Sequence, residues 1–289
     1  MTTVIELIEA GARQLDEAGV AFGHGTANAF DEAAWLVLWQ LRLPLDDLDS
    51  VADKTVAPAD AERVASLLKT RIETRKPAAY LTKEAWLQGV SFYIDERAIV
   101  PRSFIAELVA DGTIDYWLDD GTRQVLDLCT GNGSLAVLAA MTYPDVHVTG
   151  ADISSDALEV AAINVTKHQL DARITLVQSD GLAALPGPYD LILCNPPYVN
   201  ADSMEVLPAE YKAEPRLALA GGKDGMDFIR TLLASAPAVM SERAVLVLEI
   251  GNERENFEAA FPRLETIWLE TSAGDDQVLL LTRDALVGP

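Results

Sequence analysis

Residues 125–133 read VLDLCTGNG, a short apolar run that leads into a loop with two glycines. A pattern typical of a helix follows directly, at 134–142. Similar apolar runs alternate with helical patterns further along the chain, at 146–152, 174–178, 189–194 and 244–250. Continuous apolar strands that alternate with helices indicate a parallel sheet buried on both faces. We therefore predict an α/β fold with a doubly wound, mostly parallel sheet of the Rossmann-like class.

The segments on either side of these strands follow different patterns. Two apolar runs near the C-terminus, 264–269 and 278–281, have no strong helical pattern between them, so we expect an antiparallel hairpin at one edge of the sheet. On the N-terminal side, apolar residues recur at three- and four-residue steps. This spacing predicts three helices, at 4–18, 28–41 and 58–75.

Aromatic and β-branched residues dominate the segment between these helices and the sheet, with one apolar run at 86–94 and another at 98–100. The charged residues Asp95-Glu96-Arg97 separate the two runs, so the segment is expected to be a hairpin that links two domains. The predicted organisation is a helical domain at 1–80, a linking hairpin at 81–104 and the sheet domain at 105–289.

Composition limits the class of protein. Apolar residues make up 49% and charged residues 23% of the 289 residues, values close to the averages of globular proteins, so the chain can bury a core. The 45 acidic residues outnumber the 22 basic ones, and the net charge of −23 repels phosphate backbones. Broad electrostatic capture of nucleic acid is therefore disfavoured. A basic protein partner would be attracted, although an acidic surface serves solubility equally well.

Cysteines, histidines and apolar runs exclude further classes of protein. Cys129 and Cys194 form no CxxC pair and the three histidines do not cluster, so neither a disulfide framework nor a metal site is expected. The first apolar stretch contains acidic residues, unlike a signal peptide, and no apolar run approaches the roughly 20 residues of a membrane span. We expect a cytoplasmic protein with no membrane partner.

The glycine loop predicts a nucleoside site. Gly131 and Gly133 let the backbone turn tightly and approach a ligand closely. Asp152 ends the second strand, close to the roughly 20-residue offset at which a carboxylate accepts hydrogen bonds from a ribose. The loop is neither GxGxxG nor a P-loop, and Asp127 opens it, so a cationic ligand fits better than a pyrophosphate. S-adenosylmethionine, with a sulfonium and an amino group beside its ribose, meets this requirement.

A second segment, Asn195-Pro196-Pro197-Tyr198, follows the fourth strand. The order of strands in such sheets reverses between the first and the fourth, so this tetrapeptide is expected to face the glycine loop. Prolines lack N–H groups and present carbonyl oxygens rigidly, and Asn195 adds a side-chain acceptor. Together they can hold both hydrogens of a planar NH₂ group, which gains positive charge as it attacks a methyl group.

These two motifs and several segments resemble the glutamine methyltransferases of the HemK and PrmC type, over nearly the whole chain. The further segments are YLTKEAW at 80–86, FYIDER at 92–97, VPRS at 100–103, LPAEY at 207–211 and EP at 214–215. They are similar to the PrmB subgroup, which modifies the third large-subunit ribosomal protein. Enzymes that modify release factors at the GGQ motif carry a PRPETE-like segment where this chain reads PRSFIAE, at 101–107.

The resemblance implies a class I methyltransferase domain that uses S-adenosylmethionine, releases S-adenosylhomocysteine and methylates a glutamine amide in a protein. The helical domain would then recognise the substrate. The residues implied for the amide are Asn195, Pro196, Pro197 and Tyr198. Those implied for the methyl donor are Arg102, Glu107, Asp127, Thr130, Gly131, Asn132, Gly133, Asp152, Ile153, Asp180 and Asn195. Arg102 and Glu107 would close the donor pocket, unless each is a surface ion pair.

The sequence departs from the family pattern in three places. Asn132 stands where a serine is common, and Phe104 stands where a proline is common. Gly181 follows Asp180 where release-factor enzymes have a tryptophan near the adenine. The sequence therefore does not identify a residue that would stack on the adenine.

The leading hypothesis is methylation of a glutamine in the third large-subunit ribosomal protein, a basic partner that suits the acidic chain. Methylation of a release factor is the nearest alternative. An adenine or cytosine N-methyltransferase would use the same tetrapeptide, but the net charge and the lack of a segment rich in lysine and arginine disfavour it. A ribosome-assembly factor without catalysis is the last alternative, and the intact tetrapeptide argues against it. The oligomeric state does not follow from the sequence.

Overall fold

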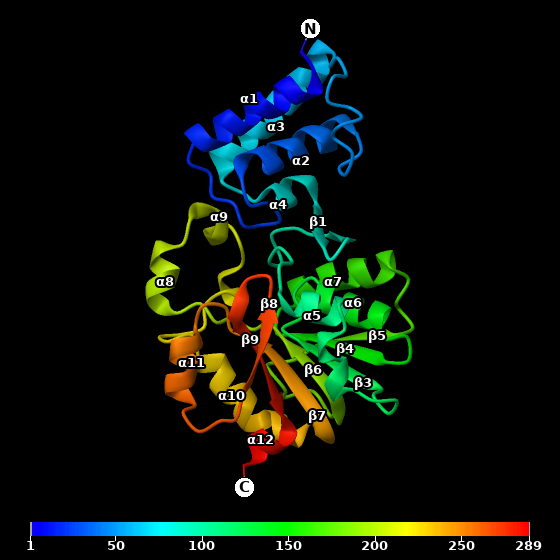
Figure 1. Cartoon of the computed structure of the whole chain (residues 1–289), viewed down its shortest axis with the longest axis vertical. Helices are drawn as coiled ribbons and strands as arrows, with labels where there is room; N and C mark the ends of the chain where they lie inside the picture. The colour runs from blue at the N-terminus through cyan, green and yellow to red at the C-terminus, as the bar shows by residue number, and fades with distance from the viewer. Residues whose placement is uncertain (1, 289) are drawn as a thin grey trace.

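The structure is a computed structural model that describes residues 2–288. Figure 1 shows two layers along the long axis, with the N-terminal helices at one end and a sheet flanked by helices at the other. The N-terminal helices are α1 (Val4–Glu17), α2 (Ala29–Leu41), α3 (Pro58–Thr74) and α4 (Ala78–Thr82). They agree with the three predicted helices and add the short α4. Thr3 and Glu6 form a capping box that satisfies the backbone N–H groups at the start of α1.

The linking hairpin turns at a different place from the one we predict. Its strands are β1 (Glu84–Leu87) and β2 (Val90–Tyr93), and the turn between them is Gln88-Gly89. Both turn residues have positive φ, 49° and 73°, which suits the twist of a two-residue hairpin. The prediction that Asp95-Glu96-Arg97 separates two strands is wrong. The Asp95 carboxylate instead accepts a hydrogen bond from the Arg97 N–H and turns the chain toward the sheet domain.

The seven-stranded sheet has the order β5-β4-β3-β6-β7-β9-β8. Its strands are β3 (Gln124–Leu128), β4 (His147–Asp152), β5 (Ile174–Gln178), β6 (Tyr189–Cys194), β7 (Met240–Glu249), β8 (Ile267–Thr271) and β9 (Gly274–Thr282). The first five strands of that order pair in parallel, whereas β9 runs antiparallel to β7 and β8. The predicted parallel sheet and its antiparallel edge hairpin are thus confirmed.

Two apolar cores cover the two faces of the sheet. One contains residues of α5 (Ile105–Ala110), α6 (Ser134–Thr142) and α7 (Ser155–Lys167). The other contains residues of α10 (Asp227–Ser235) and α11 (Arg254–Ala260), with α12 (Arg283–Val287) packed against it. Strands covered on both faces need apolar residues at successive positions, which explains why their sequences read as continuous apolar runs.

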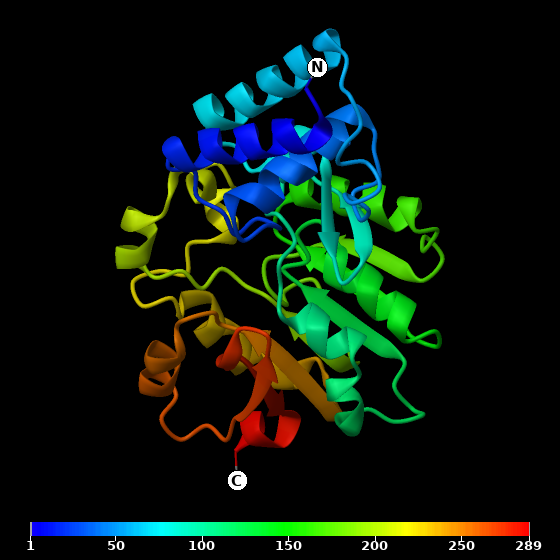
Figure 2. The same ribbon diagram turned by 45° about the horizontal axis from the view of Figure 1, so that its top comes forward.

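A loop after β6 connects the sheet domain to the helical domain. It contains α8 (Ala201–Val206), α9 (Ala209–Lys212) and the 3₁₀ turn η2 (Arg216–Ala218). In Figure 2 this yellow-green segment rises to the N-terminal helices. Fully buried Arg71 of α3 joins the two parts, because it donates to Glu32 Oε1 (2.8 Å) and to Glu210 Oε1 of α9 (3.2 Å). This buried ionic contact fixes how the helical domain sits on the loop.

The remaining short elements are the 3₁₀ turns η1 (Thr113–Trp117) and η3 (Ala236–Ala238). Within residues 2–288, no helix has the length and apolar character needed to cross a membrane. The same residues contain no group of three or more histidine, cysteine or acidic side chains placed to hold a metal ion.

Candidate active site

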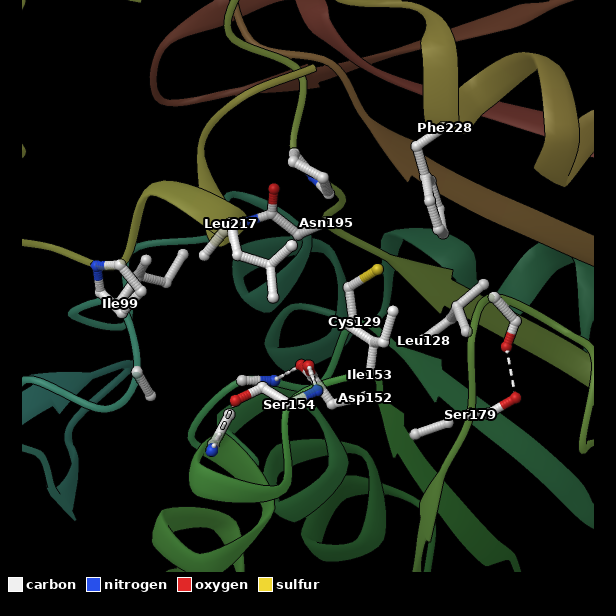
Figure 3. Close-up of a pocket in the computed structure, with 18 of the residues that line it drawn as sticks. Ile99, Leu128, Cys129, Asp152, Ile153, Ser154, Ser179, Asn195, Leu217 and Phe228 are labelled. Carbon is white, nitrogen blue, oxygen red and sulfur yellow. Dashed lines mark hydrogen bonds between the residues drawn. The ribbon is translucent and has the colours of Figure 1, made fainter. Parts of the chain in front are cut away.

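A cavity of about 210 Å³ lies at the carboxyl ends of β3, β4 and β6, where the strand order reverses. Figure 3 shows side chains from several separate segments around this hollow, among them Asn195, Cys129, Asp152 and Phe228. The lining residues come from five stretches: 97–99, 128–131, 151–157, 179–181 and 195–197, together with Pro215, Leu217, Ala218 and Phe228. The expected meeting of the glycine loop and the Asn195 segment is therefore observed.

The glycine loop is held by two carboxylates. Asp152 Oδ2 accepts from the Gly131 N–H and its Oδ1 from the Ser154 N–H, each at 2.9 Å. Asp127 Oδ2 accepts from the Thr130 hydroxyl and from the Ala136 N–H. Gly131 has a φ of 55°, in the left-handed region that favours glycine. These contacts leave the loop backbone rigid and open toward the cavity.

The second glycine of the loop, Gly133, lets the loop pack closely against α7. Gly133 has a φ of 80°, and a Cβ there would lie 3.1 Å from the Ala161 Cβ on α7. The same helix carries Asn164, whose side chain donates to the Asn132 carbonyl (2.8 Å) and to the Tyr93 carbonyl (2.9 Å). Asn164 also accepts from the Tyr93 N–H (2.7 Å), so it fastens the hairpin to the glycine loop.

Asp127 and Asp152 lie in a region of low solvent access that contains no neutralising side chain among their described contacts. Burial raises the pKa of Asp127 to about 7, an effect that its hydrogen bonds with Thr130 and Ala136 only partly oppose. Burial also raises the pKa of Asp152. Asp127 Oδ1 is buried and has no hydrogen-bond partner within residues 2–288. A ligand with a positive charge would therefore be stabilised at this end of the sheet.

Some residues of the tetrapeptide after β6 line the cavity, and others point into the protein interior. Asn195 and Pro197 line the cavity, and Pro196 is buried between them. The Tyr198 hydroxyl donates to Glu249 Oε1 (3.3 Å), and its ring lies against Gly251, where a Cβ would come within 2.5 Å of it. Burial raises the pKa of Tyr198, so the phenol stays protonated near neutral pH.

Glu249, at the end of β7, connects this tetrapeptide to the segment before α5. Its Oε2 accepts from the Ser103 hydroxyl (2.6 Å) and from the Phe104 N–H (2.9 Å). Burial raises its pKa, although the Ser103 and Phe104 donors favour the ionised form. Sequence reasoning assigned Glu249 no role beyond the end of a strand, because its partners lie about 50 and 146 positions away.

The structure brings some of the predicted site residues to the cavity and places others behind it. Those that line it are Gly131, Asp152, Ile153, Asp180, Asn195 and Pro197. Those that lie behind it or in the adjoining loops are Asp127, Thr130, Asn132, Gly133, Pro196 and Tyr198. Asp127, which opens the loop, is buried behind it and accepts from Thr130 and Ala136.

Arg102 and Glu107 are not among the lining residues. Arg102 makes two 2.7 Å hydrogen bonds with the carboxylate of Glu214, which is buried, so this contact is no surface ion pair. Glu107 accepts from the N–H (2.9 Å) and the hydroxyl (2.6 Å) of Ser272, in the turn between β8 and β9. In this structure, therefore, neither side chain closes the cavity directly.

The apolar lining residues that the sequence did not identify include Ile99, Leu217 and Phe228. Phe228 lies near Gly181, where an added Cβ would be 3.9 Å from its ring. An aromatic ring from α10 thus occupies the neighbourhood in which the sequence lacks a tryptophan. No local pattern marks Phe228, because only the packing of α10 brings it beside residue 181.

The arrangement can hold a nucleoside with a cationic group and, next to it, a planar amide. Asp152 offers carboxylate oxygens at the sequence offset typical of a ribose-binding residue. Ile153 and Phe228 offer apolar surface to the same cavity. The orphaned oxygen of Asp127 fits a cation rather than a phosphate. The residues present therefore fit S-adenosylmethionine.

Comparisons with known proteins agree with this chemistry. A family model described as "Methyltransferase small domain" matches residues 115–210, which include both the glycine loop and the tetrapeptide. A Bordetella pertussis protein named ribosomal protein uL3 glutamine methyltransferase is 53% identical over 289 residues, 99% of this chain and 97% of that protein. A Bradyrhizobium diazoefficiens protein of the same name is 44% identical over 286 residues, 96% of this chain and 90% of that protein.

A solved structure shares the fold. The hMettl16 catalytic domain in complex with MAT2A 3′UTR hairpin 6 superposes with a TM-score of 0.52, covering 78% of this chain and 81% of that chain. Its sequence is 15% identical, so the likeness concerns the fold alone.

Proposed function

The chain belongs to the family of the ribosomal protein uL3 glutamine methyltransferases, and we propose that it methylates the side-chain amide nitrogen of a glutamine in that ribosomal protein. It is a methyltransferase, and its cofactor is S-adenosylmethionine. One observation carries the proposal beyond the family: Asn195 and Pro197 line the same cavity as Gly131 and Asp152. An amide holder and a nucleoside holder therefore meet at one place.

The proposed donor site uses residues from three strand ends. Asp152, Asp180, Ile153 and Phe228 all line the cavity. Asp152 would accept from the ribose hydroxyls, Asp180 would hold the adenine edge, and Ile153 and Phe228 would supply apolar surface for the adenine. Gly131 leaves room for the methionine end, with Thr130, Asn132 and Gly133 fixing the loop around it. The cofactor supplies an electrophilic methyl group on a sulfonium and leaves as S-adenosylhomocysteine.

The proposed acceptor site stabilises charge on nitrogen. The Asn195 side-chain oxygen and the Pro196 carbonyl each accept one hydrogen of the glutamine NH₂ group. The nitrogen gains positive charge as the N–CH₃ bond forms, so these acceptors bind the transition state more tightly than the ground state. The surplus N–H proton then leaves to water, and no strong base is needed. Glu249 and Gly251 hold Tyr198, which supports the prolines beside the amide plane.

We further place the chain with the HemK and PrmC type of glutamine methyltransferase, on the likeness of the DLCTGNG segment and of Asn195–Tyr198. Residues 1–80 are the proposed recognition domain, residues 81–104 the link and residues 105–289 the catalytic domain. A ribosomal protein that neutralises rRNA phosphates needs basic residues, and a basic substrate would be attracted to a chain with a net charge of −23.

Methyl transfer from labelled S-adenosylmethionine tests the proposal. Purified uL3 and a purified release factor are incubated separately with the enzyme, and the modified peptide is identified by mass spectrometry. We expect label on one glutamine of uL3 alone. Label on the release factor would overturn the substrate assignment, and label on neither protein would overturn the function.

Replacing Asn195 with Ala tests the acceptor site. Loss of one transition-state acceptor lowers kcat by about 10²–10³-fold, by analogy with other preorganised hydrogen-bonding sites. Binding of S-adenosylmethionine, measured by calorimetry, should change little. Asn252→Ala, at an exposed position, is the matched control. Unchanged turnover in Asn195→Ala would contradict the mechanism.

A further inference from the structure

A second hollow, of about 600 Å³, lies between α2, the loop after it and the linking hairpin. We call it the α2 groove. It is lined by His24, Gly25, Thr26, Phe30, Asp31, Ala34, Trp35, Leu38, Leu45, Asp46, Leu48, Ala85, Trp86, Val100 and Pro101. Its residues come from the helical domain, from β1 and from the chain that leads into the sheet domain.

The α2 groove combines exposed apolar side chains with acidic ones. Phe30, Leu45 and Trp86 are 41%, 36% and 47% exposed, which is unusual for large apolar side chains around one hollow. The charged side chains that line it are Asp31 and Asp46, and no lysine or arginine does so among the described residues. Such a surface favours an apolar side chain flanked by basic ones.

Two buried polar groups in the wall of the groove lack hydrogen bonds. His24 is only 1% exposed, and its Nδ1 has no partner in the described part of the chain. The Trp35 Nε1 is likewise buried without a partner there. Buried polar atoms are normally hydrogen-bonded, so this wall of the groove is incompletely satisfied in the described structure.

The α2 groove shares a wall with the active-site cavity. Ala98 and Ile99 line the cavity, and the next two residues, Val100 and Pro101, line the groove. Glu214 fastens this segment, because it accepts from the Val100 N–H (2.9 Å) and from Arg102. A substrate chain lying in the groove is thereby directed toward the cavity.

Recognition of the target glutamine needs contacts of this kind. Asn195 and the prolines can bind the amide of any glutamine, so they cannot select one protein from another. The occupant must also fit the acidic rim, and a protein that neutralises rRNA phosphates carries the basic residues to do so.

We propose that the α2 groove binds a basic segment of the uL3 substrate, which inserts an apolar side chain between Phe30, Leu45 and Trp86. This inference rests on the proposed function and deepens it. The acidic residues Asp31 and Asp46 attract the flanking lysines or arginines. The groove therefore sets the affinity for the protein substrate, and the cavity sets the chemistry.

Steady-state kinetics with full-length uL3 tests the groove, using Trp86→Ala and Asp46→Lys. Each variant should raise KM for uL3 by about tenfold, which corresponds to about 1.4 kcal/mol, and leave kcat and the KM for S-adenosylmethionine unchanged. The Asp46→Lys effect should shrink as salt is added, because salt screens exposed charges. A short peptide that contains the glutamine but ends before the basic segment should react equally with all variants.

Two matched controls separate the groove from general surface effects. Tyr116→Ala removes an aromatic ring that is 86% exposed elsewhere, and Asp120→Lys reverses an exposed charge outside the groove. Both should leave KM for uL3 unchanged. An unaltered KM in active Trp86→Ala and Asp46→Lys enzymes would overturn the groove while leaving the proposed function intact. Failure of the unmodified enzyme to methylate uL3 would overturn the proposed function and, with it, the assigned occupant.

Cross-linking identifies the occupant directly. The photoreactive residue p-benzoylphenylalanine replaces Phe30, and the irradiated mixture of enzyme and uL3 is analysed by mass spectrometry. We expect an adduct with a lysine- or arginine-rich segment of uL3. An adduct with a second copy of this chain, or an adduct with uL3 that maps to an acidic segment, would overturn the proposal.

Discussion

Asp127 behind the glycine loop and Glu214 at the junction of the two domains respond differently to burial. Behind the loop, burial raises the pKa of Asp127 to about 7, and no cationic side chain opposes it. At the junction, burial also acts on Glu214, but the Arg102 guanidinium outweighs it and lowers the pKa to about 2. The junction carries its own counter-charges, whereas the loop leaves a negative site for a ligand to neutralise.

The paired carboxylates at the junction contribute to stability, whereas unpaired Asp127 is available for function. Arg71 joins Glu32 of the helical domain to Glu210 of the loop after β6, and Arg102 joins the link to Glu214 of the same loop. These carboxylates have their cations within the chain, so the junction is stable before any ligand arrives. Ionised Asp127 destabilises the free protein, and we propose that the cationic cofactor relieves this cost on binding.

The largest effect is expected at the junction. Arg71→Ala leaves Glu32 and Glu210 buried without their cation and removes a fully buried side chain, which lowers the unfolding free energy by about 3–5 kcal/mol. Urea denaturation measures the change. Arg63→Ala, which breaks an exposed pair with Asp60, is the control and should cost less than about 1 kcal/mol. A similar cost for both variants would remove the contrast between the two regions.

The pH dependence of stability sharpens the contrast. Asp127 binds its proton more tightly in the folded chain than in the unfolded one, so wild-type stability falls as pH rises from about 4 to about 7. Asp127→Asn cannot ionise. Relative to wild type, the variant should therefore gain about 2–4 kcal/mol between pH 4 and pH 8, at 1.36 kcal/mol per pKa unit.

Urea denaturation of both proteins at several pH values gives this difference. Parallel curves for wild type and Asp127→Asn would mean that Asp127 titrates in its ordinary range. The loop would then resemble the junction, and the charge argument for the cofactor would fail.

Cofactor binding provides a smaller but more specific test of the loop. Asp127→Asn should weaken S-adenosylmethionine binding by about tenfold, or about 1.4 kcal/mol, because it removes a buried negative charge near a cation. Methylthioadenosine is a neutral nucleoside without the sulfonium and the amino acid. Its affinity should change little, and calorimetry compares the two ligands. Equal losses for both ligands would assign Asp127 to loop structure rather than to charge recognition.

The smallest effect is expected at Tyr198. Tyr198→Phe removes one 3.3 Å hydrogen bond to Glu249, which keeps its shorter bonds from Ser103 and Phe104. Stability should fall by less than about 1.5 kcal/mol, and kcat should remain close to wild type. A large loss of kcat with unchanged cofactor affinity would show that the hydroxyl, and not the ring, acts in the reaction.

Much of the fold follows from local pattern. The apolar runs at 125–128 and 189–194 lie within β3 and β6, because a strand buried on both faces requires apolar residues throughout. The hairpin turn was missed because Gln88-Gly89 is a weak turn signal beside the charged cluster at 95–97. The local sequence pattern therefore predicted which strands exist better than where the linking hairpin turns.

The candidate site also has one part that the sequence predicts and one part that it does not. The facing of the glycine loop and the Asn195 segment could be predicted because both follow parallel strands, and such ends meet at one edge of the sheet. The placement of Phe228 beside Gly181 could not, since it depends on how α10 packs.

Residue type, spacing along the chain and strand order were enough to indicate an α/β sheet, a nucleoside loop and an amide holder in this protein, because each depends on neighbours close in sequence or on a rule of topology. Contacts over long separations required the folded chain. Glu249 finds Ser103, Arg102 finds Glu214, and the α2 groove forms from three separate segments. Such contacts depend on how helices and strands pack against one another. The periodicity of a sequence predicts each element but not its neighbours in space.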